Sequence, residues 1–122
     1  MIIYMSEKRI KGMTRRLQKV LRELGVDLKY TRCLNLAVRL LGFDDHQDFL
    51  ARDLDAPFSA LDDQLSDDDF VARDDHQMGV LTAAGLGPVA RELLDRCNPT
   101  GSWSRTPLDE PVWDTVAGND PL

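Results

Sequence analysis

The sequence predicts an all-α protein: a three-helix, helix-turn-helix-like N-terminal unit, two further helices and an extended C-terminal tail. Apolar residues recur three and four positions apart in several stretches, which is the spacing of one helix face. Residues that start or stop helices border these stretches, and no stretch has the alternation of a strand. The 122 residues, of which 43% are hydrophobic and 30% charged, suffice for one core of ordinary globular composition.

Residues 6–24 form the first expected helix. Its apolar residues fall on one side, and Gly25 is expected to end it. The apolar stripe consists of Ile10, Met13, Leu17, Val20, Leu21 and Leu24. The other faces make this a long basic helix, because they carry Lys8, Arg9, Lys11, Arg15, Arg16, Lys19 and Arg22.

Residues 31–41 form the second expected helix. Thr31 is expected to be its N-cap, and Gly42 its stop. The expected inward face consists of Cys33, Leu34, Ala37, Val38 and Leu41.

A short third helix is expected directly afterwards. Asp44 or Asp45 caps its start, and it runs through Leu50, with Phe49 and Leu50 as its apolar contacts. Three helices joined by short turns predict that residues 1–51 form a compact basic unit resembling a helix-turn-helix.

Residues 52–65 are expected to be an irregular acidic linker, and residues 66–98 a two-helix segment packed on the first unit. Ser66 is expected to cap the first of these helices, because three aspartates that the helix dipole favours follow it. That helix should end near Ala84, and the next should begin at Pro88. The expected inward residues are Phe70, Val71, Met78 and Leu81, followed by Val89, Leu93, Leu94 and Cys97.

Residues 99–122 are expected to be an extended tail, because prolines and glycines replace the helical periodicity. The tail carries both tryptophans, Trp103 and Trp113, which a wholly disordered segment seldom does. We expect these rings to anchor the tail on the protein's own body. A neighbouring subunit and a partner protein are the alternatives.

Charge is divided unevenly along the chain. Residues 1–40 contain ten Lys/Arg and three Asp/Glu, a net charge of +7. Residues 41–122 contain five Lys/Arg and eighteen Asp/Glu, a net charge of −13, so the whole chain has a net charge of −6. This division indicates a basic surface for nucleic acid, an acidic surface for a basic partner, or both. The alternative is that the two halves attract each other within one fold.

The basic helix at residues 6–24 is the leading candidate for a contact surface. Exposed Lys and Arg side chains neutralise phosphates without reading base sequence. The segment lacks the interleaved aromatic residues of a single-strand binder. The alternatives are a solvated face without a ligand and, less favoured, a helix on a membrane surface.

An acidic cluster lies around the start of the fourth helix. It lacks the glycine and terminal glutamate of a calcium loop, and paired carboxylates alone do not make a hydrolase. A solvated face is the first interpretation, and an acidic surface for a partner protein is the other. The cluster consists of Asp62, Asp63, Asp67, Asp68 and Asp69.

Neither the histidines nor the cysteines have the spacing of a metal motif. Asp-Asp-His-Gln occurs twice, and His46 and His76 are only weak candidates for metal ligands. Cys33 and Cys97 are expected to be buried thiols. No phosphate loop or nucleophile elbow is present in the sequence, so we expect no cofactor and no catalytic residues.

The N-terminal residues carry no recognisable export signal. Residues 1–4 are too short for the core of a signal peptide, and no stretch approaches the ~20 apolar residues that span a bilayer. We therefore expect a cytoplasmic protein without membrane contact. Because Met5 reads as a second start, we also expect residues 1–4 to be dispensable.

A moderately specific pattern runs through residues 8–51: a basic helix ending in glycine, a polar link, a second helix, and then glycine, an aromatic, an acid and another aromatic. Its positions are Lys11, Leu17, Leu21, Gly25, Leu28, Leu34, Ala37, Gly42, Phe43, Asp45, His46 and Phe49.

With this pattern the segment resembles a small helical domain of bacterial proteins described as glyoxalase-related or glyoxalase superfamily. His46 stands where that family usually has Trp or Tyr, and Phe49 where it usually has Leu. The resemblance implies a helical module, often beside mobile elements. It implies no glyoxalase activity, because the chain lacks the paired βαβββ modules and the His/Glu metal site.

The sequence favours a small non-catalytic binding protein of bacterial, phage or plasmid origin, whose basic N-terminal helix contacts nucleic acid or an acidic partner. The alternative is an acidic inhibitor of a defence or toxin system, of anti-CRISPR, anti-restriction or antitoxin type, acting by protein–protein binding. A metal-dependent enzyme is the least favoured hypothesis. Assembly into a homo-oligomer is left open.

Overall fold

Five α-helices and one short 3-10 turn make up the regular structure of residues 1–101, the part of the chain that the computed structural model describes. No strand occurs in this range, so the prediction of an all-α fold is confirmed. None of these helices is long and apolar enough to cross a membrane. In chain order the elements are α1 (Glu7–Glu23), α2 (Tyr30–Leu40), α3 (His46–Leu50), the 3-10 turn η1 (Asp62–Gln64), α4 (Asp67–Ala83) and α5 (Gly87–Cys97).

α1 begins and ends where the sequence predicts. The Ser6 hydroxyl oxygen accepts a hydrogen bond from the Arg9 N–H at 3.1 Å, which satisfies one of the free donors of the first turn. At the other end Gly25 has a φ of +88°, a left-handed conformation that glycine adopts without strain. The apolar stripe is buried at Ile10, Met13, Leu17, Val20 and Leu21.

The next two helices differ little from the prediction. α2 begins at Tyr30, after Lys29, so the prediction of Thr31 as N-cap is wrong. Thr31 lies within the first turn instead, and no side chain caps this helix. α3 is capped by Asp45, whose side chain accepts a hydrogen bond from the Asp48 N–H at 2.8 Å.

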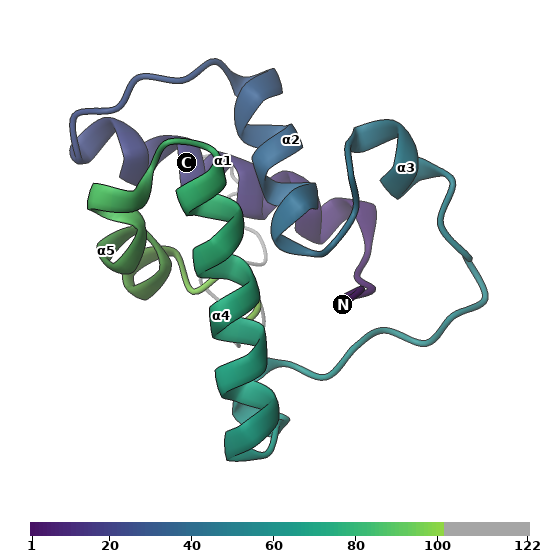
Figure 1. Cartoon of the computed structure of the whole chain (residues 1–122). Helices are drawn as coiled ribbons and strands as arrows, with labels where there is room; N and C mark the ends of the chain where they lie inside the picture. Colours follow the sequence, from purple (N-terminus) through teal and green to yellow (C-terminus); the bar gives the residue numbers. More distant parts are fainter. Residues whose placement is uncertain (102–122) are drawn as a thin grey trace.

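Three residues expected to face inward are exposed. The exposed fractions are 45% for Leu50, 45% for Phe70 and 55% for Val71, so these predictions are wrong. α3 is only five residues long, and Phe49 is its one buried residue. The first half of α4 extends past the other helices (Figure 1), and the residue it buries there is Arg73.

One hydrophobic core joins the two halves of the chain. α1 packs against α2 and α5, and α4 packs against the same two helices (Figure 1). Leu17 from α1, Leu81 from α4 and Leu93 from α5 are all fully buried members of this core. The later helices therefore complete the core that the earlier ones begin.

The N-terminal segment is part of the core. Ile3 is 2% exposed and Met5 is 5% exposed, and the Ile3 N–H donates a hydrogen bond to the Leu41 carbonyl at 2.8 Å. A Cβ at Gly42 would lie 1.7 Å from the Met1 carbonyl oxygen, so the segment lies directly against the end of α2. The expectation that residues 1–4 are dispensable is therefore wrong.

Candidate nucleic-acid interface

Five basic side chains form a row along the outer face of α1, which we call the basic row. Successive members lie three, four, four and three positions apart. At 3.6 residues per turn this spacing places them within an arc of about 80°. All five are exposed, and the opposite face of α1 is buried. The basic row consists of Lys8, Lys11, Arg15, Lys19 and Arg22.

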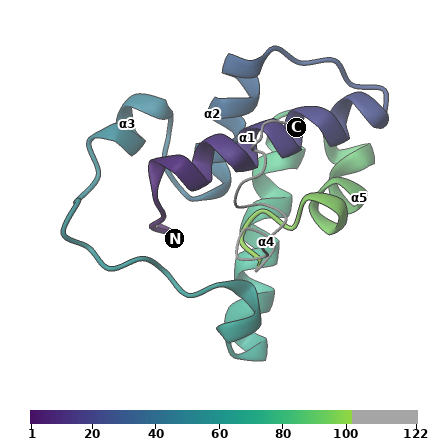
Figure 2. The same ribbon diagram turned by 180° about the vertical axis from the view of Figure 1, so that it is seen from behind.

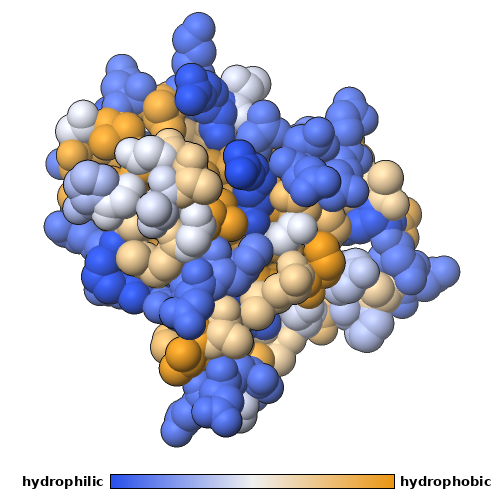
Figure 3. Space-filling view, in the orientation of Figure 1, coloured by the Kyte–Doolittle hydropathy of each residue, from blue (hydrophilic) through white to orange (hydrophobic). Residues whose placement is uncertain are grey.

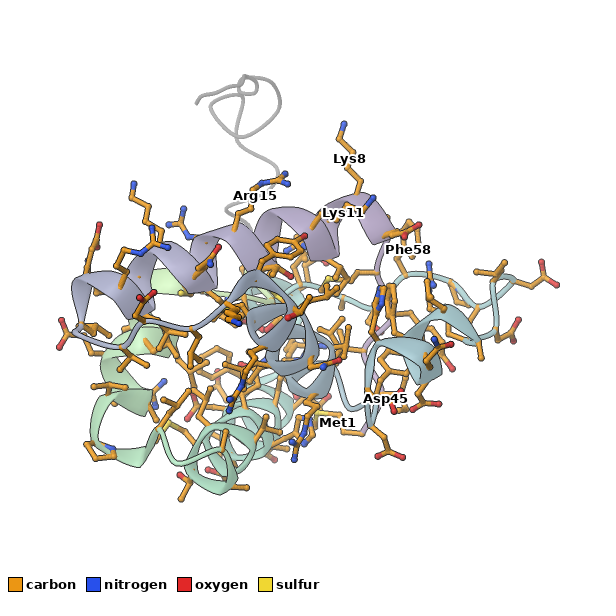
Figure 4. The ribbon with its side chains drawn as sticks, turned by 90° about the horizontal axis from the view of Figure 1, so that it is seen from above. Met1, Lys8, Lys11, Arg15, Asp45 and Phe58 are labelled. Atoms are coloured by element: carbon orange, nitrogen blue, oxygen red, sulfur yellow. The ribbon has the colours of Figure 1, made fainter. Side chains whose placement is uncertain are left out.

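Within residues 1–101, no other helix covers the basic row. In Figure 2, α1 crosses the near face of the molecule, in front of α2, α4 and α5. Figure 4 shows Lys8, Lys11 and Arg15 on the side of α1 that faces away from the other helices. At 1.5 Å per residue the row is about 21 Å long, which corresponds to about six nucleotides at 3.4 Å per strand.

The remaining two basic residues of the predicted set are engaged within the fold. The Arg9 guanidinium donates a hydrogen bond to the Gly101 carbonyl. Arg16 Nε donates to the Cys97 carbonyl at 3.1 Å, and its Nη2 donates to the Arg96 carbonyl at 3.3 Å. These two acceptors lie at the C-terminal end of α5, where the helix dipole favours a positive charge. Five of the seven predicted residues are left on the outer face.

The basic row is little neutralised within residues 1–101. Arg22 forms an ion pair with Asp27 at 3.9 Å, but both side chains are largely exposed, where such a pair contributes about 1 kcal/mol or less. No ion pair engages the other four members in this part of the chain. Of the two acids in α1, Glu23 pairs with Arg96, and Glu7 lies in the first turn, where the helix dipole favours it.

α3 offers no comparable surface. In a DNA-binding helix-turn-helix the second helix enters the major groove. α3 is five residues long, and Asp44, Asp45 and Asp48 are exposed around it. These carboxylates would be repelled by phosphates, so the basic row is the surface in the N-terminal unit that suits nucleic acid.

Of the five acids in the predicted acidic surface, one is largely buried and four are exposed. Asp62 is largely buried: its carboxylate pairs with Arg73 at 3.1 Å and accepts a hydrogen bond from the Thr100 hydroxyl at 2.7 Å. Asp62 is therefore part of the internal structure rather than of a partner surface. Figure 3 shows hydrophilic residues at the tip of the molecule where α4 begins. The exposed acids there are Asp63, Asp67, Asp68 and Asp69.

A buried polar network links the linker, α4 and the residues after α5. Arg73, 7% exposed, also donates to the Ala60 carbonyl at 2.8 Å. Gln77, 4% exposed, donates to the Thr100 hydroxyl at 3.1 Å, and the Asp62 N–H donates to the Thr100 carbonyl at 2.9 Å. This network was not predicted from the sequence, because its members lie far apart in the chain and form no local pattern.

A pocket of about 180 Å³ lies between α4 and α5, beside this network. Its charged lining residues pair with one another: Arg73 with Asp62, and Arg91 with Asp74 and Asp95. The hydrogen bond from Arg91 holds the pKa of the Asp74 carboxyl below its usual range. Both arginines of the lining are paired with its three aspartates, which leaves a net charge of −1 and no surplus positive charge with which to bind an anion.

The two histidines have different neighbours. The His46 ring stacks on Phe49, with 6.3 Å between the ring centroids. Burial lowers the pKa of His76, and the positive charge at the Met1 amino group lowers it further. Hydrogen bonds to the backbone at the end of α2 act in the opposite direction and raise this pKa. Within residues 1–101, no group of three or more His, Cys, Asp and Glu side chains is placed to hold a metal ion.

Both cysteines are buried free thiols, as the sequence predicts. Burial raises the pKa of the Cys97 thiol to about 12. Burial also raises the pKa of Cys33. Since the thiolate is the reactive form, both side chains act as small hydrophobic groups at neutral pH.

Comparison with known proteins found no match to the chain among protein-family models, curated proteins or solved structures. The resemblance of residues 8–51 to the glyoxalase-related helical domain therefore stays a prediction. So do the anchoring roles of Trp103 and Trp113, which lie outside the described residues 1–101.

Proposed function

We propose that this protein is a non-catalytic nucleic-acid-binding protein and that the basic row of α1 is its contact surface. The observation that carries the proposal is the concentration of five exposed positive side chains on one helix face. Such a patch creates a positive potential that attracts polyanions. The cytoplasm of a bacterium, or of a cell carrying a phage or plasmid, is the compartment we expect.

Binding of this kind is electrostatic and independent of base sequence. Each Lys or Arg that neutralises a phosphate releases counterions. The logarithm of the binding constant then falls with the logarithm of the salt concentration, by about 0.9 per contact on B-DNA and about 0.7 on single strands. Five contacts predict a slope of about −3.5 to −4.5. Arg9 and Arg16 contribute indirectly, because they hold α1 in place.

Two triple variants that remove the same positive charge test this proposal. The binding variant should weaken affinity at every salt concentration and reduce the magnitude of the salt slope by about 2 to 3, measured by fluorescence anisotropy. The control variant should bind like the unaltered protein, because its residues are exposed on α2 and α5. The binding variant replaces Lys11, Arg15 and Lys19 with Gln, and the control replaces Arg39, Arg91 and Arg96 with Gln.

Two results would contradict the proposal. One is an unaltered protein that binds no DNA or RNA at low salt. The other is an equal loss of affinity in both triple variants, because net charge would then account for binding without the basic row. Circular dichroism spectra of all three proteins check that their helices are intact.

A second candidate function is inhibition of a defence or toxin protein. It is supported by the four exposed acids around the start of α4, which form no ion pair within residues 1–101. These carboxylates suit a basic site on another protein. Inhibition of a purified restriction or CRISPR nuclease that persists after loss of nucleic-acid binding would favour this candidate.

A further inference from the structure

Phe58 is a large apolar side chain that the fold presents to solvent. Its exposed fraction is 70%, whereas phenylalanine is usually among the more buried residue types. The segment that carries it is anchored. The Ser59 N–H donates to the Tyr4 carbonyl, and the Tyr4 N–H donates to the Ser59 hydroxyl, both at 2.9 Å. The exposed ring therefore belongs to a segment that two hydrogen bonds to Tyr4 hold in place.

The same two hydrogen bonds bring Phe58 to the start of the basic row. Tyr4 comes two residues before Ser6, the N-cap of α1, so the segment around Phe58 lies against the residues that lead into that helix. In Figure 4, Phe58 lies at the end of the molecule where α1 begins. The sequence indicated no aromatic residue among the basic ones, because Phe58 lies far from the row along the chain.

A second aromatic residue borders the basic row further along. Tyr30, the first residue of α2, is half-buried. Burial raises the pKa of its hydroxyl, and the positive charge of Arg15, a member of the basic row, opposes that rise.

We infer that the basic row binds single-stranded nucleic acid, with one base stacked on Phe58 and successive phosphates along α1. This inference rests on the proposed function and adds the class of ligand. Proteins that bind single strands without sequence preference combine a positively charged track with aromatic rings on which bases stack. In a duplex the bases already stack on one another, so duplex binding would make no use of an exposed ring.

Phe58→Ala tests the inference with short labelled oligothymidine and oligouridine and with a labelled duplex of the same length. Loss of one stacked base should weaken single-strand binding about 5- to 150-fold and leave duplex binding unchanged. Phe58→Trp should retain single-strand affinity, because it keeps a stacking surface. Phe70→Ala is the matched control, since Phe70 is a 45% exposed phenylalanine on α4, outside the basic row.

The outcomes separate this inference from the proposed function. If the unaltered protein binds no nucleic acid, the proposed function fails, and this inference fails with it. If the protein binds, but Phe58→Ala has no effect or weakens duplex and single strand alike, the proposed function stands and single-strand recognition is overturned. A selective loss with oligothymidine or oligouridine supports the inference. Unchanged melting temperatures confirm that the variants are folded.

Discussion

Arg73 holds a positive charge inside the molecule, where its exposed fraction is 7%. Its partners, the Asp62 carboxylate and the Ala60 carbonyl, belong to the linker that precedes α4. The long side chain therefore fixes the linker against the helix. Loss of one partner from such a buried pair is strongly destabilising, because the other charge is left without compensation in a site that excludes most water.

Arg73→Met should lower the free energy of unfolding by about 3 kcal/mol and the melting temperature by at least about 10 °C. Arg91→Met is the control, because the ion pairs of Arg91 with Asp74 and Asp95 are more exposed and worth about 1 kcal/mol or less. Thermal unfolding, monitored by circular dichroism, measures the stability of both variants. A control that loses as much stability as Arg73→Met would show that burial of the Arg73 pair is not what stabilises the linker.

At the scale of single elements, the end of α2 combines a helix stop with a close backbone crossing. Gly42 has a φ of +95°, and a Cβ there would lie 1.7 Å from the Met1 carbonyl oxygen. Gly25 ends α1 with a φ of +88°, but a Cβ there would have no atom within 4 Å. The two glycines thus share a left-handed conformation and differ in the space around them.

Gly25→Ala should cost about 1–2 kcal/mol of stability, the strain of a left-handed alanine. Gly42→Ala should cost at least about 2 kcal/mol more, because it also displaces the segment that buries Ile3. Denaturant titration measures the difference. Hydrogen exchange gives a second readout, since the Ile3 amide should lose protection in Gly42→Ala only. Equal destabilisation of both variants would contradict the backbone crossing.

Helix boundaries were largely predictable because their signals are local. Ser6 and Asp45 each cap a helix within three residues of the donor they satisfy, so a short window of sequence contains the whole interaction. Contacts between elements far apart in the chain decide the burial of the residues that were predicted wrongly. Ile3 is buried through a hydrogen bond to α2, and Phe70 is exposed because the first half of α4 turns Arg73 inward instead.

The candidate site was predictable in part for the same reason. The basic residues of α1 and its apolar stripe share one segment, so the sequence alone indicates a basic outer face. The acceptors that engage Arg9 and Arg16 lie in residues 96–101, too far along the chain for a local pattern to reveal. Phe58 was not predicted as part of the site, because the bonds that bring its segment to the start of α1 join Ser59 to Tyr4, far apart in the chain.

At the scale of the whole molecule, the two halves of the chain depend on each other. Leu81 and Leu93, from α4 and α5, are fully buried in the core that contains the apolar stripe of α1. Arg16 adds polar bonds from α1 to the end of α5. The N-terminal three-helix unit thus lacks part of its core when it stands alone.

A peptide of residues 1–51 should therefore show no cooperative thermal transition, because its apolar residues have no partners from α4 and α5. Addition of a peptide of residues 52–122 should restore helical circular dichroism and a cooperative melt. The unaltered chain is the reference. A sigmoidal melt of residues 1–51 alone would show that they fold as an independent domain.

The bonds from Arg9 and Arg16 to residues 96–101 also constrain how the protein is made. The first helix leaves the ribosome early, but the groups that secure its inner face are synthesised last among the described residues. At 5–20 residues per second, translation through residue 101 takes roughly 5–20 s. During that time α2 is available to cover part of the apolar stripe of α1, and the part of the stripe that α5 buries in the finished fold stays exposed on the nascent chain.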